Sequence, residues 1–404
     1  ERFARRFQQE IGVFHSQLSR QEKLVLNEKI VRGQIRLVIG ARSATFAPLP
    51  KLGIIIIDEE HESSYKQSET PRYQARDLAI IRANRLGVPV VLGSATPSIE
   101  SYENAQRGKY QLLRLTCRPA GVQMPQVNIV PMGAAAIKDP GAITMLSQEL
   151  EQAIGQRIEK GEQTLLFLNR RGFSNFLMCP YCHWVARCEE DDIVLTIHRK
   201  SAGKRKPGAE PEMELELFPR PLHAQEAFLK CHFCGKASGY PSGCPNCGEE
   251  VVAMGSGTQR IEEALRRVFP DTTILRLDQD SVGGRRGFIK AWQDMVSGQA
   301  QIILGTQMIA KGLHLERVTL VGVILADVGL FIPDFRAEER TFSLLMQVAG
   351  RAGRTHMGEV LLQTYMPHHS AIQLAAQHDY ETFFKVEMQR RRKMRFPPAE
   401  RLIA

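Results

Sequence analysis

Gly53-Ile54-Ile55-Ile56-Ile57-Asp58-Glu59-Glu60-His61 joins four successive isoleucines to three carboxylates and a histidine. An apolar run without alternation predicts a strand that is buried on both faces of a parallel sheet. Ligands of such sheets bind just beyond the carboxyl ends of the strands. Because Mg²⁺ is usually held by one or two carboxylates together with substrate phosphates, the acidic end predicts a nucleotide site. The alternative is an ordinary strand that ends in a solvated acidic turn.

Two further strands of the N-terminal part are predicted to end in small or polar residues. The apolar residues 88–92 lead into Gly93-Ser94-Ala95-Thr96, and residues 35–40 lead into Ala41-Arg42-Ser43-Ala44. Residues 93–96 would bring small hydroxyl side chains to the same ligand edge as the acidic end of the isoleucine strand, and two strand ends with polar groups are stronger evidence than one. At residues 41–44, small residues let backbone N–H groups approach a phosphate, although ordinary connecting-loop chemistry explains them equally well. Helices are predicted over residues 77–86 and 19–33, the latter with a Ser19–Glu22 capping box.

Residues 62–77 interleave aromatic and cationic side chains, among them Tyr65, Lys66, Arg72 and Tyr73. Single-stranded nucleic acid suits this pattern, because bases stack on rings while cations follow the phosphate backbone. A solvated loop anchored by two tyrosines is the alternative interpretation.

The composition indicates a globular protein of two or three domains. The chain has 404 residues, of which 43% are hydrophobic and 24% charged, and a formal net charge of +9. It contains no apolar run near the ~18 residues that a membrane span needs, and the N-terminal residues have no signal-peptide core. We therefore expect a cytoplasmic protein without a membrane partner. The positive charge is compatible with a nucleic-acid partner but does not identify one.

A second α/β unit is predicted in the C-terminal part. Residues 118–141, rich in Pro, Gly and Ala, predict a connector between two lobes. Helices are predicted over residues 146–160 and 259–269, and strands over residues 163–168, 273–277, 318–327 and 358–364. Residues 302–312 predict a further buried strand with a polar, glycine-bearing exit.

Seven of the eight cysteines lie between residues 179 and 247. Six of them form three C-x-x-C pairs, at 179 and 182, 231 and 234, and 244 and 247. Two such turns close a four-thiolate zinc site, so the spacing predicts metal rather than disulfides. Cys188 is left over, and Asp191 stands where its partner is expected. Asp192, His183 or His198 could also complete a second site, which would otherwise be weakened or empty.

Three other segments of the C-terminal part have a composition or spacing that predicts a structure or a function. Residues 199–221 carry opposite charge blocks and predict a disordered insertion. Arg351 and Arg354, three apart, are expected on one face of a helical turn, where a charged fork suits phosphate, and a solvated charged turn is the alternative. The basic residues 390–395 are compatible with a nucleic-acid contact or with a solvated helix face.

Several of these motifs resemble those of superfamily 2 helicases in order and spacing. They are residues 58–61, 93–96, 305–307 with Lys311-Gly312, and 347–354. Within that superfamily, the chain is more closely similar to the primosomal replication-restart helicases. This closer resemblance rests on residues 38–44, 63–67, 72–73, 75–79, 167–172 and 334–336, and on the cysteine module inside the second lobe.

The resemblance implies two RecA-like α/β lobes with parallel sheets that bind ATP and Mg²⁺ between them. It implies 3′→5′ movement on single-stranded DNA, recognition of forked DNA, and partners among primosome proteins and the single-stranded DNA-binding protein, in the bacterial cytoplasm at the nucleoid. The implied domains are residues 1–132 for lobe one, 133–178 and 249–375 for lobe two, 179–248 for the zinc-binding insertion, and 376–404 for the start of a C-terminal region.

The resemblance also implies roles for individual residues. Asp58 would hold Mg²⁺, Glu59 would orient or deprotonate the attacking water, and Arg354 would act as an arginine finger. The remaining implied nucleotide-facing residues are Glu60, His61, Gly312, Gln347 and Arg351. The implied DNA-contacting residues are Arg42, Tyr65, Lys66, Arg72, Tyr73, Arg170, Arg171 and Lys311.

The implied zinc pairing is nested. One ion would take Cys179, Cys182, Cys244 and Cys247, and the other would take Cys188, Asp191, Cys231 and Cys234. This sequence departs from the family's pattern at Asp191, where the family has cysteine. It also lacks a GxxxxGK[ST] phosphate-binding loop, which leads us to expect a fragment of a longer protein.

Two alternative functions stay open at this point. The chain could be another superfamily 2 translocase that acts in restriction or RNA remodelling, although the cysteine module argues against this. It could instead be a non-catalytic zinc module on an α/β scaffold that only binds DNA or protein, because it lacks the phosphate-binding loop.

Overall fold

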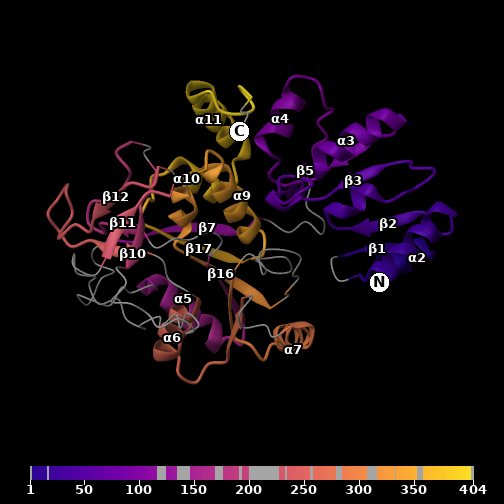
Figure 1. Ribbon diagram of the computed structural model, residues 1–404. Coiled ribbons are helices and arrows are strands. Elements are labelled where there is room, and N and C mark those ends of the chain that lie inside the picture. Colours follow the sequence, from indigo (N-terminus) through magenta and orange to yellow (C-terminus); the bar gives the residue numbers. More distant parts are fainter. Residues whose placement is uncertain are drawn as a thin grey trace, which may run out of the picture. The chain divides into compact units, whose positions relative to one another are not determined.

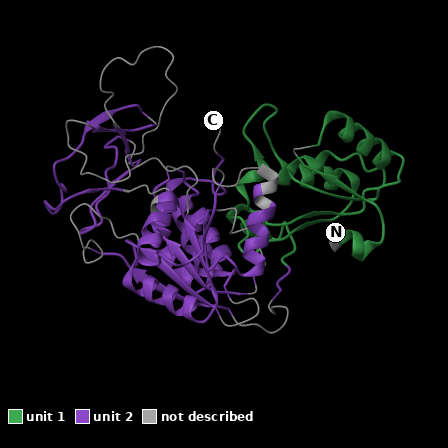
Figure 2. Ribbon diagram, turned by 90° about the horizontal axis from the view of Figure 1, so that it is seen from below, with its two compact units in different colours: residues 1–112 green, residues 113–404 purple. Residues whose placement is uncertain are grey.

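The computed structural model describes most of the chain. The described ranges are residues 2–15, 18–115, 124–133, 146–168, 176–190, 193–199, 227–232, 234–254, 258–278, 284–306, 315, 317–332, 334–352 and 358–401. The chain divides into two compact units, residues 1–112 and 113–404 (Figure 2). None of the described helices is both long enough and apolar enough to cross a membrane.

The first unit begins with the short helix α1 (Arg2–Phe7) and a parallel pair of strands, β1 (Ile11–Phe14) and β2 (Leu37–Gly40). The helix α2 (Arg20–Val31) connects β1 to β2. Its predicted capping box is confirmed, because the Ser19 and Glu22 side chains each accept a hydrogen bond from the other residue's backbone N–H. Ile30 packs with Ile35 and Ala47 to form a small core beneath this helix.

The isoleucine run forms β3 (Ile55–Ile57), which pairs in parallel with β6 (Val90–Leu92). The helix α3 (Ala75–Leu86) precedes β6, and α4 (Ile99–Gln106) follows it. The expectation of burial on both faces is wrong. Ile56 is 67% exposed, and its cross-strand neighbour Val91 is 42% exposed. Within the described residues, β3 and β6 form a two-stranded sheet that leaves one apolar face in solvent.

The second unit contains a six-stranded parallel sheet in the order β14-β15-β8-β16-β17-β7 (Figure 1). The strands are β7 (Gln126–Pro131), β8 (Gln163–Leu168), β14 (Ile274–Leu277), β15 (Ile302–Gly305), β16 (Val318–Ile324) and β17 (Glu359–Thr364). The helices are α5 (Gln148–Glu159), α6 (Thr258–Val268), α7 (Gly284–Ser297), α9 (Ala337–Ala349), α10 (Ser370–Ala376) and α11 (Tyr380–Met394). The α/β class with parallel sheets is therefore confirmed.

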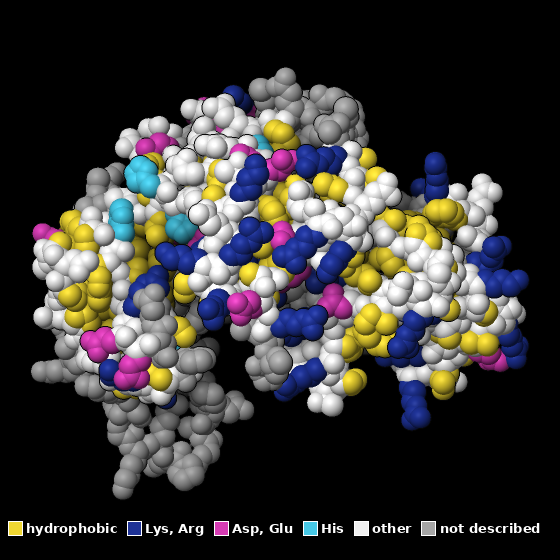
Figure 3. All heavy atoms as spheres, turned by 90° about the horizontal axis from the view of Figure 1, so that it is seen from above, with side chains coloured by type: hydrophobic (Ala, Val, Ile, Leu, Met, Phe, Trp, Pro, Cys, Tyr) yellow, Lys and Arg dark blue, Asp and Glu magenta, His cyan; other side chains and the backbone are white. Residues whose placement is uncertain are grey.

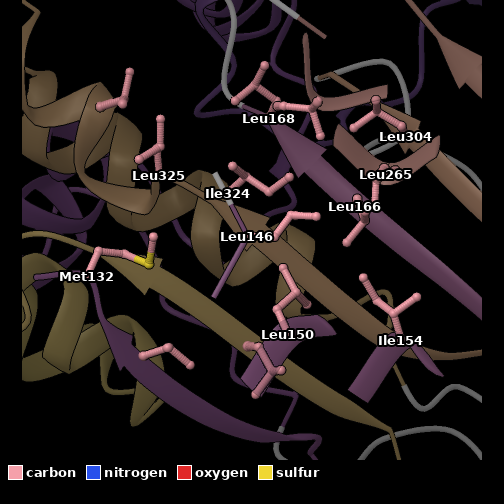
Figure 4. Close-up of a cluster of buried hydrophobic side chains, with 14 of the residues drawn as sticks. Met132, Leu146, Leu150, Ile154, Leu166, Leu168, Leu265, Leu304, Ile324 and Leu325 are labelled. Carbon is pink, nitrogen blue, oxygen red and sulfur yellow. The ribbon is translucent and has the colours of Figure 1, made fainter. Parts of the chain in front are cut away.

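The core of this unit lies between the sheet and the helices α5 and α6 (Figure 4). Every residue of β8 is buried, as its apolar run predicts for a central parallel strand. Gly322 of β16 lets α5 pack close to the sheet, because a β-carbon there would lie 2.7 Å from Leu166 Cδ2 and 2.9 Å from Leu150 Cδ1. A side chain at position 322 would therefore push the helix away from the sheet.

The connector expected over residues 118–141 contains an unpredicted strand. β7 pairs in parallel with β17 along its whole length and forms one edge of the sheet. Pro131 ends the strand at this edge, a position where a missing N–H is tolerated. β7 belongs to the second compact unit, which begins after residue 112.

The cysteine-rich module is built on a five-stranded antiparallel sheet in the order β12-β11-β10-β9-β13. Its strands are β9 (Phe176–Met178), β10 (Thr196–Arg199), β11 (Ala227–Lys230), β12 (Ala237–Gly239) and β13 (Val252–Met254). The module therefore begins at β9 and returns to the α/β unit through β13, slightly outside the expected 179–248. The segment predicted to be disordered lies almost entirely outside the described residues.

Arg391 of the basic C-terminal segment is fully buried, so neither expectation for this residue is correct. Its Nε donates to Glu387 Oε1 at 2.7 Å, and its Nη2 donates to Glu339 Oε2 at 2.6 Å. The Pro397 carbonyl accepts a third hydrogen bond from Nη1 at 3.1 Å. Because Glu339 belongs to α9, this buried cluster fixes α11 against α9.

Replacing Arg391 with alanine is expected to lower the free energy of unfolding of the second unit by about 3–5 kcal/mol, because buried Glu339 and Glu387 would both lose this guanidinium, although Glu387 would keep its ion pair with Arg390. Urea denaturation of the chain measures this change. Lys393→Ala, an exposed cation on the same helix, is the matched control and should change stability by less than about 0.5 kcal/mol. Equal effects of the two substitutions would contradict the structural role of the cluster.

Candidate functional site

The carboxyl ends of β3 and β6 lie side by side in the first unit. The backbone N–H of Gly93 donates to the Ile57 carbonyl at 2.8 Å, and that of Glu60 donates to the Gly93 carbonyl at 3.1 Å. Parallel pairing thus brings the acidic turn after β3 next to the Gly93–Thr96 segment after β6. The expectation that two strand ends present polar groups at one edge is confirmed in its geometry.

Asp58, Glu59 and His61 occupy this edge. Glu59 has a positive φ of 49°, an uncommon conformation for a residue other than glycine, and its N–H donates to Asp58 Oδ1 at 3.0 Å. His61 Nδ1 lies 2.7 Å from Ser94 Oγ and 3.7 Å from Glu59 Oε2. The turn therefore displays two carboxylates at the strand end, with a histidine fixed between them and the neighbouring strand.

Glu60 points the other way, into the protein, and is only 1% exposed. Its oxygens accept hydrogen bonds from Arg76 Nη1 at 2.9 Å, from the Ser98 N–H at 2.6 Å and from Ser101 Oγ at 2.9 Å. Ser98 is also the N-cap of α4. This geometry favours a positioning role for Glu60, which ties the acidic turn to α3 and α4, over direct contact with a nucleotide.

Arg76, Ser98 and Ser101 are the residues that the sequence interpretation did not connect to the site. A serine before a helical segment is a recognisable N-cap signal. Nothing in the sequence spacing, however, indicates that Glu60 would turn inward to meet these side chains.

Tyr65 links the aromatic and cationic segment directly to the acidic turn. Its hydroxyl donates to the backbone carbonyl of Asp58 at 2.7 Å. Burial raises the pKa of Tyr65, and the negative charges of Asp58 and its neighbours raise it further, so the phenol stays protonated and can donate. The ring is half-buried, in the short helix η2 (Ser63–Tyr65).

Arg42 also fixes this segment from within the first unit. Its Nη1 donates to the carbonyls of Ser64 at 3.3 Å and Lys66 at 3.2 Å. The segment then forms a small hairpin from β4 (Lys66–Gln67) and β5 (Tyr73–Gln74). Arg42 was expected to contact DNA, but in this structure its guanidinium holds the backbone of the loop.

The side chains of the hairpin differ in their exposure. Lys66 and Arg72 are exposed, whereas Tyr73 is half-buried with its ring edge against Phe46, at 5.1 Å between centroids. The two cations are therefore accessible to a partner, and the same hairpin carries the Tyr73 ring.

In the second unit, Gln347 lies in the last turns of α9, and Arg351 follows the end of that helix. Both side chains are half-buried, and the Arg351 N–H donates to the Val348 carbonyl at 3.0 Å. The other expected nucleotide- and DNA-facing residues of this unit lie outside the described residues. They are Arg170, Arg171, Lys311, Gly312 and Arg354.

Four cysteines of the module form one compact group: Cys179, Cys182, Cys244 and Cys247. Their sulfurs all lie within 4.8 Å of one another, with Cys179–Cys247 at 3.5 Å and Cys182–Cys244 at 3.4 Å. A disulfide would need about 2.05 Å, whereas a tetrahedral zinc ion with bonds of about 2.3 Å sets separations of about 3.8 Å. The donor set and its spacing therefore fit a closed zinc site, in the implied nested arrangement.

The three C-x-x-C turns share one backbone design. In each, the residue after the second cysteine has a left-handed conformation: His183, Gly235 and Gly248 have φ values of 61°, 79° and 79°. Its N–H donates to the carbonyl of the first cysteine, at 2.9, 3.1 and 2.9 Å respectively. Glycine at two of these positions was visible in the sequence and suits this conformation.

Cys188, Cys231 and Cys234 form the second group, with Cys188 and Cys234 sulfurs 3.7 Å apart. Three thiols fit three corners of a tetrahedral site. Asp191, the expected fourth ligand, lies outside the described residues. The two groups share an apolar core in which Leu177, Leu195, Leu229 and Val251 pack around the buried thiols.

Curated proteins that match the chain carry the name replication restart protein PriA. The chain is 48% identical over 399 residues to the Bacillus subtilis protein, covering 98% of this chain and 46% of that protein. It is 41% identical over 401 residues to the Haemophilus influenzae protein, covering 98% and 51%. It is 40% identical over 406 residues to the Chlamydia trachomatis protein, covering 99% and 50%.

The chain spans about half the length of the curated relatives it matches. Among solved structures, the Mycobacterium smegmatis helicase Lhr bound to single-stranded DNA and AMP-PNP aligns with a TM-score of 0.46 and 14% identity, over 94% of this chain and 39% of that chain. No protein-family model matches the chain.

Proposed function

Because the chain belongs to the replication restart protein family over the part that it shares with these relatives, we propose that it is the motor part of an ATP-dependent DNA helicase. The observation that carries this proposal is the shared edge of β3 and β6. There, Asp58 and Glu59 stand at a strand end to which Tyr65 ties a loop with exposed cations.

In this proposal, Asp58 and Glu59 have different roles in ATP hydrolysis. Asp58 would hold the Mg²⁺ that accompanies ATP and neutralises charge on its phosphates. Glu59 would orient or deprotonate the attacking water. Gln347, Arg351 and Arg354 would face the nucleotide from the second unit, with Arg354 stabilising charge on the transferred phosphate.

The positive charge of the chain supports DNA, a polyanion, as the substrate. The formal net charge is +9, and Figure 3 shows many lysine and arginine side chains on one face, with acidic side chains among them. Lys66, Arg72 and Tyr73 would contact single-stranded DNA, since cations follow the phosphates while rings stack on bases. The Tyr65 hydroxyl would pass movements of the hairpin to the Asp58 backbone.

The finer properties of the whole protein follow the family resemblance. We propose 3′→5′ movement, recognition of forked DNA and assembly of primosome proteins, with the single-stranded DNA-binding protein as a further partner, in the bacterial cytoplasm. The thiol groups would hold two structural zinc ions.

The deciding experiment measures ATP hydrolysis by the full-length protein with forked, single-stranded and blunt duplex DNA. We expect forked and single-stranded DNA to raise turnover, and blunt duplex to raise it less. The 404-residue chain alone should hydrolyse almost no ATP, because it contains no GxxxxGK[ST] loop to hold the β- and γ-phosphates. A full-length protein that binds DNA but hydrolyses no ATP would instead support the non-catalytic binding function.

A further inference from the structure

His198 and His232 face each other at the surface of the cysteine-rich module. Their Nε2 atoms lie 3.1 Å apart, and their ring centroids are 5.1 Å apart with a tilt of 46° between the rings. Neither residue belongs to the two thiol groups. Histidine side chains are visible at the surface on the left of Figure 3, the side on which Figure 1 draws β10–β12.

Different elements hold the two rings in place. His198 lies on β10 opposite Phe228 of β11, and the two rings stack with centroids 5.4 Å apart. His232 lies inside the turn that begins at Cys231, whose N–H donates to the Lys236 carbonyl at 2.9 Å. A sheet register and a tight turn therefore fix the separation of the two imidazoles, which lowers the entropic cost of chelating an ion.

The separation of the ring nitrogens suits a shared metal ion. With metal–nitrogen bonds of about 2.0–2.1 Å, a tetrahedral ion sets two imidazole nitrogens about 3.3 Å apart. Neighbouring positions of a square-planar ion set them about 2.9 Å apart. The observed 3.1 Å lies between these values. A hydrogen bond between two neutral rings has the same length, so the two interpretations must be separated by experiment.

We propose that His198 and His232 form a two-imidazole site for a divalent transition metal ion, separate from the thiol groups. Imidazole nitrogen is a preferred ligand of Zn²⁺, Ni²⁺ and Cu²⁺. Because His232 is exposed and His198 is half-buried, water fills the remaining positions, and the site is open and exchangeable, unlike a closed four-thiolate site. This inference does not rest on the helicase function.

The test titrates Ni²⁺ into the zinc-loaded chain by calorimetry, after metal analysis has established the number of tightly bound zinc ions. We expect one further ion to bind, and His198→Ala and His232→Ala each to weaken its binding by at least about tenfold, since each removes one of two protein ligands. The matched control His368→Ala, an exposed histidine outside the module, should leave the affinity unchanged.

The zinc content of each variant is measured alongside, because His232 lies within a thiol-bearing turn. His198→Ala is the decisive variant, since its residue lies on a strand outside these turns. If His198→Ala keeps its zinc and binds Ni²⁺ as tightly as the parent chain, the proposal is overturned and the pair is a ring-to-ring hydrogen bond only. The same conclusion follows if the parent chain binds no additional ion.

Discussion

Replacing Glu59 with glutamine in the full-length protein is expected to lower ATP turnover by about 10²–10⁴-fold, the usual contribution of a positioned general base. Glu59 stands at the end of β3 with its side chain partly in solvent, and its backbone is held in a left-handed conformation beside Asp58. Glutamine has the same shape but cannot accept a proton from water. Affinity for single-stranded DNA should be unchanged, because the hairpin that is proposed to contact DNA keeps its anchors.

The matched control is Glu62→Gln, which removes one negative charge from the same turn without touching the strand end. Its turnover should stay near that of the parent protein. Steady-state hydrolysis at saturating DNA and fluorescence anisotropy of labelled DNA give the two readouts. Full ATPase activity in the Glu59→Gln protein would remove Glu59 from the catalytic role, and parallel loss in both variants would indicate a general effect of charge.

Features with strong local signals could be predicted from the sequence. The apolar runs that form β8 and β15 became central parallel strands, because continuous burial leaves no polar alternation along the chain. The Ser19–Glu22 cap formed as expected, since both of its partners lie within one turn. The C-x-x-C spacings likewise predicted the thiol groups, because the turn geometry is encoded within four residues.

The features that were predicted wrongly or missed depend on residues far away in the sequence. The exposure of Ile56 depends on which strands join its sheet, and β7 is a strand only because β17 pairs with it. Arg391 is buried because Glu339, 52 residues away, supplies a counter-charge on a different helix. Local composition at residues 390–395 cannot distinguish one buried arginine among exposed neighbours.

The same limit applies within the candidate site. Asp58, Glu59 and Glu60 are adjacent carboxylates, and the family resemblance implies a nucleotide-facing role for all three. In the structure, the left-handed turn at Glu59 separates them, and Glu60 is buried against Arg76 and Ser98. Which carboxylate turns inward is decided by partners 16 and 38 residues further along the chain.

Removal of zinc is expected to unfold the cysteine-rich module. Structural zinc contributes an apparent binding free energy of about 10–16 kcal/mol in small zinc domains, and this is folding free energy when no site exists in the unfolded chain. The module depends strongly on it, because buried Cys179, Cys188, Cys231 and Cys244 are part of its apolar core. We expect two zinc ions per chain, one at each thiol group.

Trp184 provides a local probe of this loss, since it packs against the module core, and the only other tryptophan, Trp292, lies in α7. In a Trp292→Phe background, a zinc chelator should shift the Trp184 emission to longer wavelength as the core opens. Cys179→Ser should lower the zinc content by one ion and cause the same shift, whereas Cys117→Ser, outside the pairs, should do neither.

The fourth ligand of the second thiol group determines how many zinc ions the chain binds. Asp191→Ala should lower the zinc content from two ions to one if its carboxylate supplies the fourth ligand beside Cys188, Cys231 and Cys234. Two ions in the Asp191→Ala chain would assign the fourth position to another residue or to water. One ion in the parent chain would mean that three thiols alone do not retain zinc, and that the four-thiolate group carries the stability of the module.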